Sequence, residues 1–306
     1  MAITVGVDVS TYQGQIDWAA VGRTSNRFAL ARMTIGRGTR DDRGRGNLRG
    51  MLGKVDVAGA YGVVGYEEPV TDGARLLVDE IAASGADPRR VLVMLDAEDF
   101  SDGRHPTIQQ TNRYAIQLHQ ELGRWPVAYV PGWWLSNHGY RVAGLELSNC
   151  PWAQSHYISA PWTEARLRAS RPSDLRGFKR LAWLQFTSSG AVSGIRGNVD
   201  LNCFYGTLAE FRVALLGGSA QEDDMPLNDA DIVRIREEAV IKPLADSTHV
   251  YLPPTQTKLT KISERLDAIE ATLKAGLPVS VDLSAATQEQ LDQLGAAIAR
   301  HLGDIA

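Results

Sequence analysis

The sequence predicts an α/β protein whose main part is a (β/α) barrel, and three observations support this. Short apolar runs typical of buried strands alternate with helical patterns over about the first 200 residues, as in parallel strands joined by crossover helices. The runs number close to eight, the strand count of a TIM-type barrel. No Gly-rich phosphate-binding turn accompanies them, which argues against a doubly wound nucleotide-binding sheet.

The predicted elements follow one another in a regular order from the N-terminus. Strands are expected at residues 3–9, 28–35, 63–66, 91–95, 127–130, 152–154, 181–185 and 199–201. The clearest helical patterns lie between them, at 71–83 and 107–122. The helical signal becomes thin after Tyr157. These elements place the barrel in residues 1–216.

The composition changes after the barrel. Residues 217–227 begin with GGSAQEDDMP, a small and acidic stretch that ends in proline and is typical of a linker. Residues 228–306 predict a small, mostly helical C-terminal domain. Its central helix carries an a/d seam formed by Leu259, Ile262, Leu266, Ile269 and Leu273. Two interpretations of the seam stay open, namely the inner face of a helical hairpin and a homo-oligomerisation surface.

The C-terminal region is poor in aromatic residues. All 7 tryptophans precede residue 184, and Tyr251 is the only aromatic residue after Phe211. Sugar-binding modules generally need aromatic rings on which a pyranose can stack. We therefore expect an assembly or docking element here and not a second carbohydrate-binding module.

Composition excludes several classes of protein. The formal net charge of −4 and the lack of a clustered basic face give no indication of a nucleic-acid partner. Cys150 and Cys203 are too few for a disulfide framework and have no metal-type spacing. The 6 histidines show no paired-ligand spacing, so neither a metal nor another cofactor is predicted. No apolar run is long enough to be a transmembrane segment.

The strongest local motif is VLVMLDAE at residues 91–98, a buried strand that ends in two carboxylates. Because side chains alternate along a strand, Asp96 and Glu98 share one face, with Cα atoms about 6.5 Å apart. At the C-terminal end of a barrel strand, that face opens into the active site. A carboxylic acid that keeps its proton beside an ionised partner is what glycoside cleavage requires.

Two further carboxylates are expected at the same rim. Asp8 stands at the end of the first strand, in DVSTYQG, and Asp200 stands at the end of the last predicted strand, in NVDLN. The first and last strands of a closed barrel are neighbours, so these two side chains should lie close together. Each aspartate alone could cap a loop, but four carboxylates at three strand ends indicate a shared acidic cleft.

Together, DVSTYQG, LDAE, Trp183-Leu-Gln185-Phe186 and the NVDLN segment resemble glycoside hydrolase family 25, the Chalaropsis-type lysozymes, many of which are phage endolysins. The resemblance covers residues 3–215. It implies a modified (β/α)5(β)3 TIM-like barrel. It also implies N-acetylmuramidase activity, the hydrolysis of the β-1,4 bond between N-acetylmuramic acid and N-acetylglucosamine in bacterial peptidoglycan.

The resemblance also implies roles for individual residues. Glu98 matches the general acid, and Asp96 matches the carboxylate that orients the 2-acetamido group of the substrate or the attacking species. Asp8 and Asp200 match the supporting acidic pair. The substrate-binding positions of the family's cleft correspond to Tyr66, Tyr129, Trp152 and Gln185.

The chain departs from the family pattern at two places. Glu67, in Tyr66-Glu67-Glu68-Pro69, replaces the histidine that usually follows the third-strand tyrosine, which changes the charge expected at the cleft wall. The usual Trp-Ile-Ala-x-Tyr pattern is Trp152-Ala-Gln154-Ser-His156-Tyr157 here, which departs from the family's aromatic spacing around Trp152.

Two biological roles are compatible with these motifs. The leading hypothesis is a phage endolysin, made in the host cytoplasm without a signal peptide and acting on the cell wall after release. The alternative is a virion-associated protein that uses the same barrel to bind or penetrate the wall, with the C-terminal helices docking it into a particle.

Overall fold

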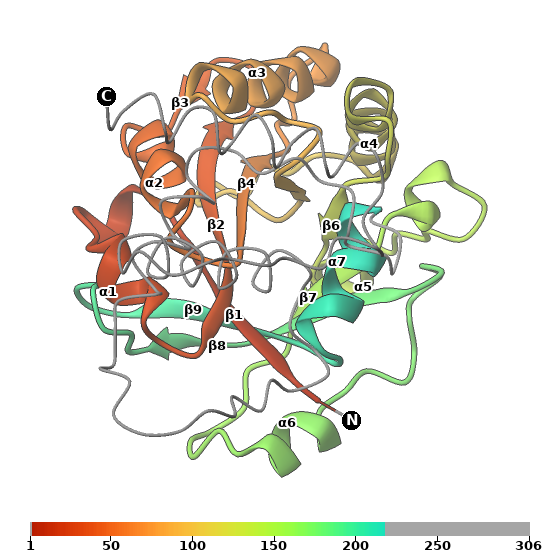
Figure 1. Ribbon diagram of the computed structural model, residues 1–306. Coiled ribbons are helices and arrows are strands. Elements are labelled where there is room, and N and C mark those ends of the chain that lie inside the picture. The colour runs from red at the N-terminus through yellow and green to blue at the C-terminus, as the bar shows by residue number, and fades with distance from the viewer. Residues whose placement is uncertain (1, 218–306) are drawn as a thin grey trace, which may run out of the picture. The chain divides into compact units, whose positions relative to one another are not determined.

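The computed structural model describes residues 2–217, which form a closed barrel of eight strands (Figure 1). Around the barrel the strands are β1 (Thr4–Val9), β2 (Asn26–Ile35), β4 (Val57–Val63), β5 (Leu92–Asp96), β6 (Val127–Tyr129), β7 (Trp152–Ser155), β8 (Leu181–Gly190) and β9 (Val199–Phe204). The short β3 (Thr39–Arg40) pairs with β2 outside the closed ring. The strands β1 to β8 of the ring pair in parallel, whereas β9 runs antiparallel to both β8 and β1. The predicted modified (β/α)5(β)3 barrel is confirmed.

Helices cover the parallel part of the barrel. The α-helices are α1 (Trp18–Gly22), α2 (Gly44–Met51), α3 (Val70–Ala83), α4 (Ile108–Leu122), α5 (Gly132–Asn137), α6 (Glu164–Ala169) and α7 (Leu208–Leu216), and two 3-10 turns are η1 (Thr11–Gln13) and η2 (Glu146–Asn149). Helices α2 and α3 pack on β2 and β4, and α3 packs on α4. Local sequence sets their ends, as in α4, where Thr107 and Gln110 form a capping box and Gly123 ends the helix with a positive φ of 72°.

Side-chain alternation divides the core into two layers. On β5, Leu92 and Met94 point into the barrel, and Val93 and Leu95 point outward to the helices. Asp96 continues the inward series of this strand. The inner layer therefore passes from apolar to acidic residues along one strand face.

The end of the barrel where the parallel strands begin is closed by helix α7. Phe211 of this helix lies in the inner layer, with its ring centroid 4.6 Å from that of Phe28, 5.2 Å from Phe204 and 6.3 Å from Trp183. All four rings are buried. Burying one such side chain contributes about 1.5–3 kcal/mol, so this aromatic plug is a main source of stability.

The third barrel strand differs from the prediction. The apolar run at 63–66 suggested a strand there, but the strand is β4, Val57–Val63, with the sequence VAGAYGV. Its small residues are required by close packing, because a Cβ on Gly59 would lie 2.9 Å from Leu92 and one on Gly62 would lie 2.6 Å from the Tyr114 hydroxyl. The shift places Tyr61 inside the barrel and leaves Tyr66 in the loop beyond it.

The linker at 217–227 and the helical domain at 228–306 fall almost entirely outside the described residues, as does the seam. They remain predictions. No helix within residues 2–217 is both long enough and apolar enough to span a membrane.

Candidate active site

The four predicted carboxylates meet at the open end of the barrel. Asp96 is the last residue of β5, and Glu98 follows two residues later on the same face. Asp8 of β1 is the register partner of Asp200 on β9. Because β9 is antiparallel, it is the beginning of this strand, and not its end as predicted, that brings Asp200 to the rim.

Asp8 is buried and held by two amide groups. Its Oδ2 accepts hydrogen bonds from Asn202 Nδ2 at 2.7 Å and from Gln185 Nε2 at 3.1 Å. Both amides come from neighbouring strands and point inward, as period-two alternation requires. Two donors on one oxygen favour the ionised carboxylate and fix its orientation.

Gln185 links this acidic pair to two tyrosines. Its Oε1 accepts from the hydroxyl of Tyr129 at 3.0 Å and from that of Tyr157 at 2.9 Å. Since the oxygen is occupied by two donors, the amide nitrogen must face Asp8. Gln185 therefore acts as a positioning residue that connects the carboxylates to the aromatic wall.

Burial raises the pKa of all four carboxyl groups. For Asp96 it acts together with the charges of Glu98 and Asp8 and raises the pKa well above its ordinary value. For Glu98, burial is followed by the charges of Asp8 and Asp99. Burial and Asp8 raise the pKa of Asp200 to about 8. For Asp8 itself burial also raises the pKa, although its amide donors oppose the shift. The cluster consequently retains protons near neutral pH.

Asp96 also has one carboxylate oxygen to which none of the residues 2–217 donates a hydrogen bond. Its Oδ1 is buried and has no partner among the described residues. An unpaired buried oxygen costs about 1–3 kcal/mol unless something donates to it. This oxygen is suited to accept a hydrogen bond from a bound molecule.

Two inward residues escaped the motif-based prediction. Arg32 of β2 opposes the pKa increases of Asp96 and Glu98 and is thus the cation of the cluster. The Nε of Arg32 donates a hydrogen bond to Asp41 Oδ2 at 2.9 Å. Tyr61 of β4 is buried, and burial with the charges of Asp8 and Asp96 raises its pKa. A charged residue inside an otherwise apolar strand was the available signal for Arg32.

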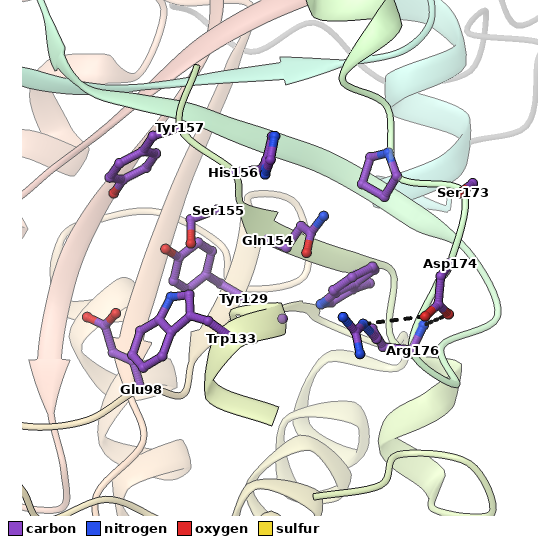
Figure 2. Close-up of a pocket in the computed structure, with 13 residues that line it drawn as sticks. Glu98, Tyr129, Trp133, Gln154, Ser155, His156, Tyr157, Ser173, Asp174 and Arg176 are labelled. Carbon is purple, nitrogen blue, oxygen red and sulfur yellow. Dashed lines mark hydrogen bonds and ion pairs between the residues drawn. The ribbon is translucent and has the colours of Figure 1, made fainter. Parts of the chain in front are cut away.

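A cavity of about 720 Å³ opens beside this cluster (Figure 2). Of the four carboxylates, Glu98 is the one that lines it, and Figure 2 shows it next to Trp133 and on the same side as Tyr157. Trp133 is 45 % exposed, whereas the adjacent Trp134 is fully buried. The far wall includes Asp174 and Arg176.

The predicted substrate-binding residues differ in how directly they face the cavity. Tyr129 lines the cavity, and Gln185 lies behind it in the hydrogen-bond network. Trp152 borders the cavity but is only 1 % exposed, because it stacks on Phe178 at 5.4 Å and its indole nitrogen donates to Val130 O at 2.8 Å. It has no free face for a ligand, since alternation turns Ala153 inward in its place. Trp133 offers the exposed ring instead.

Tyr66 and Glu67 lie at the rim and are not among the residues that line this cavity. The Tyr66 ring contacts Phe100 edge-on at 5.1 Å, and the Arg104 guanidinium lies 4.4 Å from its centroid. Glu67 is exposed and pairs with Arg37 at 3.4 Å. The changed charge at position 67 therefore affects the rim and not the buried cluster.

Comparison with known proteins finds relatives of the barrel. Residues 7–195 match the model of the glycosyl hydrolases family 25. Lysozyme M1 of Streptomyces globisporus is 26 % identical in an alignment of 226 positions that covers 70 % of this chain and 72 % of that protein. The crystal structure of the bacterial lysozyme from Streptomyces coelicolor superposes with a TM-score of 0.57 at 24 % identity, covering 71 % of this chain and 98 % of that one. The catalytic domain of a Listeria monocytogenes phage endolysin superposes with a TM-score of 0.52 at 18 % identity, covering 71 % of this chain and 98 % of that domain.

Proposed function

The chain belongs to glycosyl hydrolase family 25, and on this premise we propose that it is a lysozyme that cleaves the β-1,4 bond between N-acetylmuramic acid and N-acetylglucosamine in bacterial peptidoglycan. The observation that carries the proposal is the arrangement at the barrel mouth. One carboxyl group with a raised pKa, Glu98, lines the cavity, with three other carboxyl groups in the cluster beside it.

The proposed chemistry starts from Glu98 as general acid. Its carboxyl proton passes to the glycosidic oxygen while the bond from that oxygen to the anomeric carbon breaks. Asp96, with its unpaired Oδ1, orients the 2-acetamido group or stabilises the positive charge that develops on the sugar. Water adds to the anomeric carbon, and its proton restores Glu98.

Asp8 and Asp200 support this pair from behind. A protonated Asp200 can donate to Asp8, while Asn202 and Gln185 hold Asp8 in place. The negative charge of Asp8 contributes to the raised pKa of Glu98 and so favours the protonated form that a general acid requires. Tyr129 and the exposed face of Trp133 are the proposed sugar contacts.

The proposal is tested by digesting purified peptidoglycan with the wild type and with Glu98→Gln. The wild type should produce new reducing ends of muramic acid, identified by mass spectrometry. The variant should lose about 10²–10⁴-fold in rate, because an amide cannot donate the proton. Its melting temperature should stay close to that of the wild type. Undiminished cleavage by the variant, or glucosamine reducing ends from the wild type, would contradict the assignment.

We further propose that the protein serves as a phage endolysin, made in the host cytoplasm and acting on the wall after release. Its barrel resembles the catalytic domain of a phage endolysin, which supports this role through the fold alone. Quantifying the protein in purified particles and in the cleared lysate tests it. A protein that stays with the particles would instead support the virion-associated alternative, a wall-binding or wall-penetrating component.

The C-terminal region is proposed to be a separate assembly element. The a/d seam at 259–273 motivates this, and oligomerisation would concentrate barrels on an insoluble polymer. Deleting residues 217–306 should leave a soluble, active monomer, because helix α7 already completes the barrel core. Light scattering on both chains measures the change. An insoluble truncated chain would mean that the region belongs to the barrel fold.

A further inference from the structure

Three potential metal ligands gather at the rim of the barrel, outside the four carboxylates. Asp99 and His105 lie in the loop between β5 and α4, and His138 follows the last residue of α5. One ligand atom from each of the three lies within 4.8 Å of the other two. Because the cluster combines side chains from two separate segments, the spacing of these residues in the sequence did not predict it.

The ligand atoms of the cluster lie near one another around one oxygen of Asp99. His138 Nε2 lies 2.7 Å from Asp99 Oδ1, and His105 Nδ1 lies 3.9 Å from the same oxygen. The side chains are 21–33 % exposed, so an ion can reach them from solvent. Two imidazole nitrogens and one carboxylate oxygen form a ligand set that zinc prefers, with water in the fourth position.

The surrounding aromatic side chains support the two imidazoles. The His138 ring lies 5.5 Å from Trp134 and 5.4 Å from Tyr140, and the His105 ring lies 6.4 Å and 6.3 Å from the same two rings. The neighbouring cation Arg104 is engaged with Asp102 and with the Tyr66 ring. Packing of this kind limits the directions in which both ring nitrogens can point.

We propose that Asp99, His105 and His138 bind one divalent transition-metal ion of the zinc class. In the present structure the two imidazole rings are stacked, with centroids 3.8 Å apart. Tetrahedral coordination requires the rings to move apart while both nitrogens stay directed toward Asp99. Binding thus replaces the hydrogen bond between His138 and Asp99 with two bonds to the ion.

The bound ion has a structural consequence for the cavity. It ties the 99–106 loop, which places Phe100 and Arg104 on Tyr66, to helix α5, which carries Trp133. Helix α5 contributes Trp133 to the cavity wall, and the 99–106 loop meets the end of this helix through His105 and His138. The ion therefore acts as a clamp on this wall, and the proposal does not depend on the reaction that the barrel carries out.

The test is calorimetric titration of the full-length protein with Zn²⁺, with Mg²⁺ as the control because it prefers oxygen ligands. One Zn²⁺ per chain should bind, and the affinity should fall at least about tenfold in the double variant His105→Ala and His138→Ala. His156→Ala, which changes a histidine on another part of the cavity wall, should bind Zn²⁺ as the wild type does.

Two further measurements keep the result interpretable. Thermal melts without metal show whether the double variant is folded, and Zn²⁺ should raise the melting temperature of the wild type but not that of the variant. If the double variant does not fold, the absorption spectrum of Co²⁺ bound to the wild type provides the test. Intense bands typical of tetrahedral coordination with nitrogen ligands would support the site. No binding, weak octahedral Co²⁺ bands, or equal binding by wild type and a folded double variant would overturn the proposal. None of these outcomes bears on peptidoglycan cleavage, which is measured separately.

Discussion

The two ends of the barrel interior are built from the same strands but have opposite character. At one end Phe28, Trp183, Phe204 and Phe211 form a dry aromatic plug. At the other end, two residues further along the inward face of β8, Trp183 is succeeded by Gln185. One step of two residues is about 6.5 Å, so the change from stabilising packing to costly charge occurs within one layer of side chains.

This difference separates the source of stability from the source of activity. The plug gains free energy by burying apolar surface, whereas the mouth loses free energy by burying several carboxyl groups whose pKa values are raised. Substitutions at the plug should therefore affect unfolding, and those at the mouth should affect cleavage. The following predictions test whether the two ends are as independent as this comparison implies.

The largest effect on stability is expected from Phe211→Ala. Removing the ring leaves a cavity among Phe28, Trp183 and Phe204, which should lower the free energy of unfolding by about 3–5 kcal/mol. Denaturant unfolding measures the loss. Val213→Ala on the same helix, an exposed position, should change it by no more than about 0.5 kcal/mol. Equal losses in the two variants would show that α7 is not a plug.

Gln185→Ala should affect both stability and activity, because this residue joins the mouth to the aromatic wall. Its loss leaves Asp8 without one donor and Tyr129 without its acceptor, at a cost of about 1–3 kcal/mol. Cleavage should also slow as the Asp8 carboxylate loses its fixed orientation. The measurements are thermal unfolding and the rate on peptidoglycan. Gln154→Ala on β7 is the matched control, and an equally large loss there would argue against the network.

Asp200→Asn should stabilise the fold while lowering activity. The pKa of Asp200 is about 8 in the folded chain and near 3.8 when unfolded, so between these values the folded state binds more protons. The free energy of unfolding therefore falls as the pH rises through this range.

The amide can still donate to Asp8 but carries no charge, which should add about 0.5–2 kcal/mol at pH 8. At pH 4 the gain should vanish, because the native carboxyl is then protonated. Unfolding at both pH values measures this, with the exposed Asp174→Asn as control. A variant less stable at both pH values would make Asp200 a structural residue.

The smallest effect is expected from Trp133→Ala. An exposed ring on the cavity wall adds little to the fold but should contribute about 0.5–1.5 kcal/mol to sugar binding. KM should rise with kcat nearly unchanged, because the contact is the same in the ground and transition states. Trp133→Phe should retain most of the affinity. A fall in kcat alone would place the ring at the reacting atoms instead.

Much of the fold and the carboxylate set could be predicted because each depends on local patterns. Alternating strands and helices predicted the barrel, and an apolar strand ending in DAE predicted where Asp96 and Glu98 lie. The third strand was misplaced because its glycines and alanines are dictated by the neighbours Leu92 and Tyr114, which a local pattern does not contain. Tyr61 was missed for the same reason.

The direction in which a side chain or a strand points was harder to predict than which residues form a strand. Trp152 lies in the predicted strand, but a register shift between β7 and β8 accompanies its outward direction, so its face is packed on Phe178. Arg32 had a local signal that the motifs did not use, whereas the cluster of Asp99, His105 and His138 depends on a contact between segments 39 residues apart. The reversal of β9 could not be read from its residues, since an edge between parallel and antiparallel pairing has no local signature.

The late position of β8 and β9 in the chain also determines when the site can be completed. Asp8 accepts its hydrogen bonds from Gln185 and Asn202, which follow it in the chain by 177 and 194 positions, respectively. During synthesis the site thus stays incomplete until the last strand has left the ribosome and paired with the first. A chain broken off before residue 200 should be inert, and two separately expressed fragments should regain activity only when they reassemble the closed ring.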